Sequence, residues 1–378
     1  MQYLDQADHT CDSHLPGLRK ALQDVPLDIL ESSESPAIAL FRELGGTNLL
    51  VPSAFGGCGA DALDATRAIR ALGAVAPSLT VGTMMHHFSL GTLFAVVDAV
   101  GEGSDLRELL QRVVTDRLIV ASGFAEGRSG QGILSPTVTA RPTDGGFLLT
   151  GSKKPCSLAR SMDLLTASVG MRQDDGSVAM GFLMLPADTP GVSVHPFWGN
   201  PSLAGAESDE VRLEDVFVRP EQIVQPDPQL RDEMDQLQTV GLIWFQMMVA
   251  AGYTGIASAL VRRVLEQGRG SVSDRAALGT RLGSAVCLVE GLARSVDAGE
   301  LGNDALGHAL VTRYAVQDAI ADTVRDAVEL LGGMAYIASA DTTRLAMATQ
   351  AIAFHPPSRT SIAPGLVDHW AGGPVLVG

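Results

Sequence analysis

The spacing of apolar residues changes twice along this chain of 378 residues. From residue 1 to about 117, apolar residues recur at intervals of three and four, which is typical of amphipathic helices. From about 118 to 231, short alternating stretches are separated by Asp-Gly, Gly-Gly and Pro-Gly turns, which predicts strands. From about 232 to 378 the helical spacing returns in longer stretches. The chain must therefore adopt a fold that places a strand-rich region between two helical regions.

This pattern predicts individual elements and a fold class. The predicted helices cover residues 18–30, 35–44, 62–73, 80–100, 106–114, 234–267, 275–298, 304–331 and 341–354. The predicted strands cover 118–121, 137–140, 146–150, 164–169, 179–185, 192–195 and 210–213. We expect an α+β multidomain protein with an N-terminal α-helical domain (1–117), a middle β-domain (118–231) and a C-terminal four-helix bundle (232–378). The short, evenly spaced strands suit a small β-barrel or sandwich.

Charge and hydropathy exclude some partners. The net charge of −16 opposes binding to a phosphate backbone, so nucleic acid is not an expected partner. The most apolar stretch, residues 240–259, is interrupted by glycines and polar residues and predicts a buried helix rather than a membrane span. With 46% hydrophobic residues, the chain has apolar surface for a core and for a subunit interface. We therefore expect no membrane association and a homodimer or homotetramer.

The four cysteines are scattered, at positions 11, 58, 156 and 287, without the C-x-x-C spacing of a zinc site. Such usage fits a reducing compartment, and no charged segment followed by an apolar one opens the chain as in a secretory signal. We expect a cytoplasmic protein without a metal centre.

Four motifs in order resemble those of the acyl-CoA dehydrogenase family. Residues 124–132 (FAEGRSGQG) resemble the family's L-T-E-P-x-x-G-S-D loop, and residues 145–157 (GGFLLTGSKKPCS) resemble its G-x-x-x-N-G-x-K-x-W-I-T/S strand and turn. Residues 329–336 (ELLGGMAY) resemble Q-x-x-G-G-x-G-Y, and residues 44–59 resemble its N-terminal glycine-rich stretch. Each motif is degenerate, but the series spans nearly the whole chain and implies an acyl-CoA dehydrogenase-like fold.

The resemblance implies a cleft for FAD between the β-domain and the bundle, completed by a neighbouring subunit. It assigns Ser157 a hydroxyl or backbone N–H near flavin N5, and Gly332 and Gly333 a close backbone approach to the adenosine half. The implied cofactor-binding residues are Phe124, Ser129, Cys156, Ser157, Arg269, Glu329, Gly332 and Gly333. Simpler interpretations remain open: the glycine pair as a helix C-cap, Ser157 as a turn residue and Glu126 as a solvated loop carboxylate.

The chain departs from the family at the catalytic base, a Glu that removes the α-proton of a thioester while flavin takes the β-hydride. Alignment places Pro356 at the usual position of this Glu and Phe245 at its alternative position on the first bundle helix. Pro155 stands where the family has the Trp that covers the flavin. His355 is the candidate replacement base, with a free pKa suited to the task, although it could also only end the preceding helix.

Three further residues are candidate substrate contacts. His86 and His87 fall where the N-terminal domain would line the substrate tail. Arg359 could meet a CoA phosphate or a surface carboxylate.

Three functions remain open from the sequence. The first is a flavin-dependent oxygenase of secondary metabolism, acting on an acyl-CoA or acyl-carrier-protein thioester and reduced by its substrate or by a flavin reductase. The second is a dehydrogenase with a relocated base. The third is a flavin-binding or flavin-free scaffold without turnover. Loss of both family glutamates favours the first.

Overall fold

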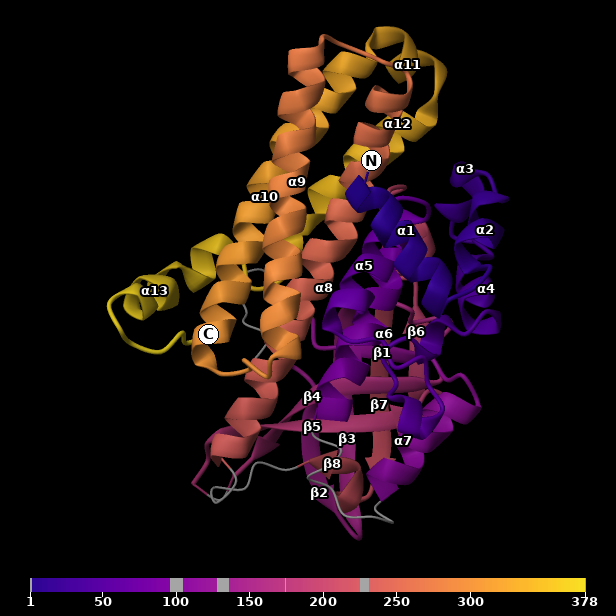
Figure 1. Cartoon of the computed structure of the whole chain (residues 1–378). Helices are drawn as coiled ribbons and strands as arrows, with labels where there is room; N and C mark the ends of the chain where they lie inside the picture. The colour runs from indigo at the N-terminus through magenta and orange to yellow at the C-terminus, as the bar shows by residue number, and fades with distance from the viewer. Residues whose placement is uncertain (1, 96–104, 128–135, 174, 225–230, 378) are drawn as a thin grey trace.

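The computed structural model describes the chain except for residues 1, 96–104, 128–135, 174, 225–230 and 378. Helices occupy both ends of the sequence and strands its middle (Figure 1). The N-terminal helices are α1 (Gln2–His14), α2 (Leu18–Gln23), α3 (Leu27–Leu30), α4 (Ala37–Glu43), α5 (Ala62–Gly73), α6 (Pro77–Ala95) and α7 (Asp105–Thr115). The C-terminal helices are α8 (Arg231–Glu266), α9 (Val272–Asp297), α10 (Asn303–Leu331), α11 (Gly333–Ala338), α12 (Ala340–Gln350) and α13 (Arg359–Trp370).

Helix boundaries follow ordinary capping chemistry. Asp61 accepts a hydrogen bond from the backbone N–H of Asp64 at 2.8 Å and so begins α5. Ser271 and Asp274 form a reciprocal capping box at the start of α9. Helix α10 ends at Gly332, whose φ of 82° favours glycine. These local signals set where the long helices begin and end.

The strands form one mixed sheet of eight strands in the order β6-β7-β3-β2-β4-β5-β8, with β1 paired to β4. Their bounds are β1 (Val120–Gly123), β2 (Thr139–Thr143), β3 (Gly146–Cys156), β4 (Leu164–Arg172), β5 (Val178–Pro186), β6 (Val192–His195), β7 (Asp209–Val218) and β8 (Ile223–Val224). β1 and β2 pair with β4 in parallel, while β5 pairs with it antiparallel. Within the described residues no pairing joins β6 to β8, so the described sheet is open and a closed barrel is not seen.

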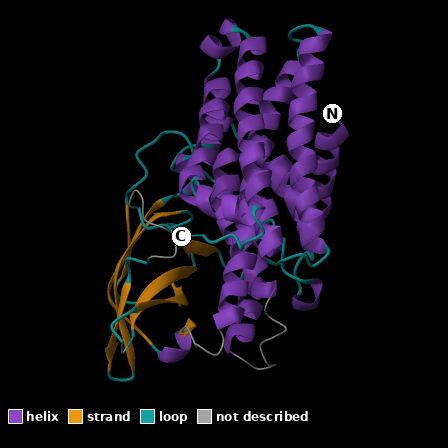
Figure 2. Cartoon of the chain, turned by 90° about the vertical axis from the view of Figure 1, so that its left-hand side faces the viewer, coloured by secondary structure: helices purple, strands orange, loops and turns teal. Residues whose placement is uncertain are grey.

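Helix α8 is the central element of the core. Its 36 residues pack against α5, α6, α9, α10 and α12. By length and composition, α8 and α9 could each cross a membrane, but 89% of the most apolar window of α8 is buried inside the protein. Figure 2 shows the sheet beside one end of the helices, whereas the other ends of α8, α9 and α10 extend away from it. The stretch 240–259 is therefore a core helix, as the sequence predicts.

The observed helices and strands agree with the predicted ones, with four additions. Helices α1, α11 and α13 and strand β8 were not predicted, and the predicted helix over 18–30 is divided near Pro26 into α2 and α3. The fold is mixed helix and sheet in the expected order. The proposed domain boundaries remain predictions.

Candidate active site

The first group of predicted cofactor residues lies where the chain leaves β1 and β3, at the ends of these strands, which we call the sheet edge. Residues that follow β1 run beside the end of β3: Ala125 accepts a hydrogen bond from the backbone N–H of Lys154 at 3.0 Å, and Glu126 forms a parallel bridge with Lys154. This brings Phe124 to the same edge as Ser157, although 33 positions separate them (157 minus 124). Ser129 lies outside the described residues.

A buried ion pair holds this edge together. The ammonium of Lys153, which is fully buried, donates to a carboxylate oxygen of Glu126 and to Oγ of Ser168 at 2.9 Å. The second oxygen of Glu126 accepts from the backbone N–H of Thr137 at 3.0 Å. Burial lowers the pKa of Lys153, and the hydrogen bond that it donates to Glu126 opposes that shift. Glu126 is therefore a buried structural carboxylate, which corrects the expectation of a solvated one.

Ser157 and Cys156 differ in what they offer to a ligand. The half-buried Ser157 hydroxyl contacts the Ser208 hydroxyl at 2.9 Å. The Cys156 side chain is fully buried, and burial raises the pKa of its thiol to about 12. Only the backbone of Cys156 is suited to ligand contact.

The chemistry of this edge fits a flavin. It combines the half-buried aromatic ring of Phe124, the hydroxyl of Ser157 and a glycine with little room around it. Gly127 has a φ of +63°, and a Cβ at this position would lie 2.4 Å from Cγ of Lys154. A flat ring with polar edges needs such a surface of aromatic, backbone and hydroxyl groups.

The second group of residues meets where α8 contacts the turn after α12. Nε2 of His355 lies 2.9 Å from the hydroxyl of Tyr253, a fully buried residue of α8. The ring of Phe245 stands edge-on to the ring of His355 at 5.9 Å and to that of Phe88 at 5.4 Å. The two positions that hold the base in the resembled family, 245 and 356, are thus both beside His355. Neither is ionisable here.

Side chains from α8 and α10 bind the backbone carbonyls of this turn. Arg313 donates to the carbonyls of Ile352 and His355. The Gln246 amide donates to the carbonyl of Pro356 at 3.1 Å, and the Tyr314 hydroxyl donates to that of Pro357 at 2.7 Å. Three buried polar side chains of neighbouring helices therefore hold the turn that carries His355.

The environment of His355 does not favour a base. Burial, with a smaller contribution from the cationic Arg313, lowers its pKa to about 3. A general base works best when its pKa is near the operating pH. His355 therefore stays neutral at neutral pH, which argues against the predicted role as a replacement base.

The remaining cofactor candidates lie at the far end of the bundle. Arg269 and Gly270 occupy the α8–α9 loop, and a Cβ on Gly270 would lie 2.6 Å from Cδ2 of Leu330, next to Glu329. Gly332 and Gly333 join α10 to α11 close by. Figure 1 shows α11 at the end of the bundle away from the strands. One chain therefore brings Arg269, Glu329, Gly332 and Gly333 together, but not with Phe124 and Ser157.

The predicted substrate residues have other partners. His86 is fully buried: Nε2 lies 2.9 Å from the carbonyl of Thr47, and Nδ1 accepts from the backbone N–H of Val120 at 3.1 Å. Burial lowers the pKa of His86 to about 4. His87 is also fully buried, and burial lowers its pKa well below the usual range. Arg359 binds the carboxylate of Asp318 at 2.6 Å. These contacts support core roles for both histidines and the surface-carboxylate interpretation for Arg359.

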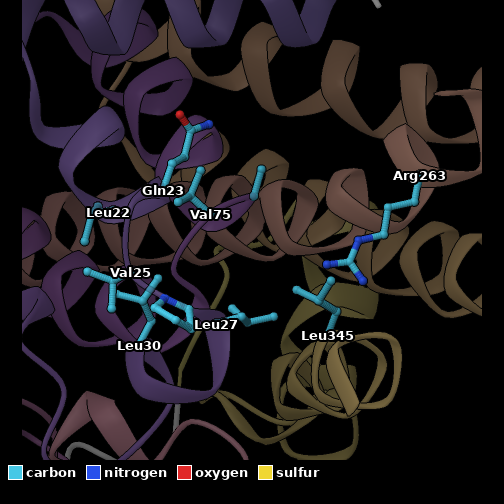
Figure 3. A pocket seen from close by; sticks show the side chains of 10 residues that line it. Leu22, Gln23, Val25, Leu27, Leu30, Val75, Arg263 and Leu345 are labelled. Atoms are coloured by element: carbon cyan, nitrogen blue, oxygen red, sulfur yellow. The ribbon is translucent and has the colours of Figure 1, made fainter. Parts of the chain in front are cut away.

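Two hollows open elsewhere on the described surface. One of about 250 Å³ lies among α2, α3, the residues that follow α5, α8 and α12, with Leu22, Val25, Leu27 and Leu345 in its wall and Arg263 at one side (Figure 3). Arg263 is paired there with Asp341 at 3.3 Å. The other, of about 210 Å³, includes Trp244, the neighbour of Phe245. Neither hollow is lined by a predicted site residue.

Sequence reasoning missed Tyr253, Gln246, Lys153 and Arg313. A usable signal existed for two of them: Gln246 and Tyr253 are seven positions apart, on one face of the mostly apolar stretch 240–259. Polar groups on a buried face need partners, and the turn after α12 provides them.

Comparison with known proteins identifies relatives over the whole length. The isobutylamine N-hydroxylase of Streptomyces viridifaciens is 50% identical over 378 residues, covering 100% of both chains. The dibenzothiophene monooxygenase of Rhodococcus qingshengii is 28% identical over 188 residues, 48% of this chain and 43% of that protein. The solved structure of XiaF from Streptomyces sp. with FADH2 and glycerol has a TM-score of 0.81 at 16% identity, covering 100% of this chain and 98% of that one. No family model matches the chain.

The fold, the flavin-compatible sheet edge and these relatives define the class. The chain belongs to the acyl-CoA dehydrogenase superfamily of flavin-dependent oxidoreductases, as a divergent member without the catalytic glutamate. Its relatives further place it among the flavin-dependent monooxygenases of that superfamily.

Proposed function

We propose that this protein is a flavin-dependent N-hydroxylase of a small primary aliphatic amine. The observation that carries the proposal is the 50% identity over the full length to an isobutylamine N-hydroxylase. The site is compatible with it: Phe245 and Pro356 replace both family glutamates, so no carboxylate at these positions removes a proton from carbon. The aromatic rings of Phe88 and Phe245 offer an apolar wall to a short alkyl chain.

The overall reaction joins RNH2 with O2, two electrons and two protons to give RNHOH and water. A reduced flavin supplies the two electrons when bound. We propose that Phe124, Ser157 and Gly127 hold its ring at the sheet edge. Phe245 and Phe88 would exclude water and orient the alkyl group. The amine must arrive with a free electron pair, because the N–O bond forms from that pair.

We propose FAD as the flavin, completed by a second subunit. The separation of Gly332 and Gly333 from Ser157 within one chain supports this arrangement. Exposed apolar side chains on the C-terminal helices, including Ile337 at 78% and Trp370 at 69% exposure, supply surface for a homodimer or homotetramer. Because a hydroxylase of this kind draws no electrons from the amine, we also propose a separate flavin reductase as partner. All four cysteines are free, which suits the cytoplasm.

A CoA or carrier-protein thioester is the alternative substrate, because the motifs resemble those of enzymes acting on thioesters. Arg359, the candidate for a CoA phosphate, already binds Asp318. This contact favours the amine.

The test is a reconstituted reaction. The purified protein, a flavin reductase, NADH, FAD and 18O2 are incubated with a panel of C3–C6 primary amines and, in parallel, with acyl-CoA thioesters. We expect an N-hydroxylamine carrying one 18O atom. An enoyl or oxygenated thioester, with no hydroxylamine, would contradict the proposal. Chromatography of the flavin released from the purified protein distinguishes FAD from FMN.

A further inference from the structure

We propose that Tyr253 is a positioning residue that holds His355 as the neutral tautomer with its hydrogen on Nδ1, so that His355 acts in the site as a hydrogen-bond donor. The inference rests on the proposed function for the site it serves. The assignment of the His355 tautomer depends only on contacts within this chain.

The direction of the Tyr253–His355 hydrogen bond follows from burial. The two atoms, Oη of Tyr253 and Nε2 of His355, are 2.9 Å apart. Among the described residues Oη of Tyr253 has no other acceptor. If Nε2 donated to Tyr253, the phenolic hydrogen would be buried without a partner, which is unfavourable. Tyr253 therefore donates, and Nε2 accepts.

Three neighbours keep this arrangement in place. Burial raises the pKa of Tyr253, so the phenol keeps its hydrogen. Arg313, whose guanidinium binds the carbonyl of His355, disfavours a second positive charge on the ring. Phe245 covers the other side of the ring with an apolar edge. The titratable groups that contact this turn from α8 and α10 are thus Tyr253, Arg313 and Tyr314, and none of them accepts a proton from His355.

A neutral imidazole that accepts at Nε2 carries its hydrogen on Nδ1. Within the described part of the chain nothing accepts from Nδ1, and His355 is only half-buried. Nδ1–H is therefore free to donate to an acceptor atom in the site bounded by Phe245 and Phe88. His355, which is next to the family's base position, thereby donates a hydrogen bond and takes up no proton.

The direct experiment is NMR on protein labelled with 15N-histidine, without flavin, from pH 6 to 9. The His355 signal is assigned by its loss in His355→Asn. We expect the shifts of a neutral ring protonated at Nδ1 throughout. A ring protonated at Nε2, or one that titrates near pH 6.5, overturns the proposal whatever the substrate is.

Variants separate positioning from general damage. In Tyr253→Phe the tautomer signal should shift toward a mixture. Tyr314→Phe is the matched control. It removes a buried phenolic hydroxyl that binds the same turn at Pro357 but does not contact the His355 ring, and it should leave the signal unchanged. Equal effects of both would overturn the positioning role.

Amide substitutions at position 355 test which ring nitrogen of His355 donates the hydrogen bond in catalysis. The amide nitrogen of Asn reaches about the position of Nδ1, whereas that of Gln reaches about the position of Nε2. Loss of one preorganised donor costs roughly 10²–10³ in kcat. We expect His355→Gln to lose about that much and His355→Asn to stay within about tenfold of the parent. The reverse order would assign the donor to Nε2 and refute the proposal. If no amine is hydroxylated but the NMR result holds, the proposed function fails and the tautomer stands.

Discussion

Lys153 and Glu126 form an ion pair inside the sheet region, where Lys153 has no exposed side-chain surface and Glu126 has 2%. The pair links β3 to the loop after β1, and so joins the two segments that present Ser157 and Phe124. Ser168 and Thr137 complete the hydrogen bonding of the two charges. The buried Lys153–Glu126 ion pair thus holds in place the sheet edge that we assign to the flavin.

Removing one partner should destabilise the protein strongly. Lys153→Met leaves the Glu126 carboxylate buried without its cation, which costs about 3–5 kcal/mol. Thermal and urea unfolding of the flavin-free protein measure this loss. Arg325→Ala, which breaks surface pairs with Asp322 and Asp326 where the Arg325 side chain is 60% exposed, is the control and should barely move either midpoint. Similar losses in both variants would show that the buried pair has no special role.

The free energy of unfolding should decrease as the pH is lowered below about 6.5. In the folded protein His355 and His86 titrate near pH 3 and pH 4, whereas in the unfolded chain both titrate near 6.5. Between these values the unfolded state binds more protons, so stability is complete above pH 6.5 and is lost as pH falls toward 4. Urea midpoints at pH 7.5 and 5.0 measure the slope. His355→Asn should have a smaller slope than the parent, and an unchanged slope would refute the low pKa.

The pH dependence of hydroxylation should follow the substrate. Because His355 stays neutral, kcat/KM should show no ionisation near 6.5 and should rise with the fraction of free amine up to the pKa of that amine. Two amines of similar shape and different basicity provide the test. A common inflection near pH 6.5 for both would implicate an enzyme histidine and contradict this expectation.

Phe245 should limit the size of the substrate. Its side chain is 8% exposed and packs against Phe88 and His355. Phe245→Ala opens space in this wall and should shift kcat/KM from C4 toward longer or branched amines, with a stability loss of about 3–5 kcal/mol. Phe55→Ala, which removes an edge-to-face pair with Phe94 outside the proposed site, is the matched control. It should leave the order of substrates as it was.

Ser157 should matter for flavin affinity more than Ser208. Both hydroxyls share one hydrogen bond, but only Ser157 belongs to the motif that resembles a flavin-binding turn. We expect Ser157→Ala to raise the dissociation constant of the flavin by about tenfold, the worth of one hydrogen bond of about 1.4 kcal/mol. Fluorescence titration measures it. If Ser208→Ala raised the dissociation constant of the flavin more than Ser157→Ala, the flavin contact would be assigned to Ser208 instead.

The sequence predicted the order of elements because periodicity and turn residues are local signals. The strands from β3 to β7 and helices α5, α8, α9 and α10 lie near their predicted positions. Short elements were harder: α13 contains Pro364, which argues against a helix in sequence, yet it begins with a Ser358 cap. Pairing in the sheet, such as β2 beside β4, could not be predicted because it joins segments that share no local pattern.

In the candidate site, too, some residues could be predicted from local sequence patterns and others could not. Phe124, Ser157, Phe245 and His355 are predicted from motif position. The roles of Lys153 and Tyr253 depend on contacts 27 and 102 residues away, which no spacing in the sequence reveals. His86 was misjudged because a histidine in sequence does not indicate whether backbone groups already occupy its nitrogens.

The shape of the turn from Ile352 to Pro357 is set by Gln246, Arg313 and Tyr314, which all bind backbone carbonyls of the turn and none of its side chains. Substitution within the turn therefore leaves these bonds available. Mutation can exchange the chemical group presented at positions 354–356 without rebuilding the scaffold. A lineage that began with a carboxylate here could lose it in few steps and keep a folded protein, which gives one ancestral framework a short evolutionary route between desaturation and oxygenation.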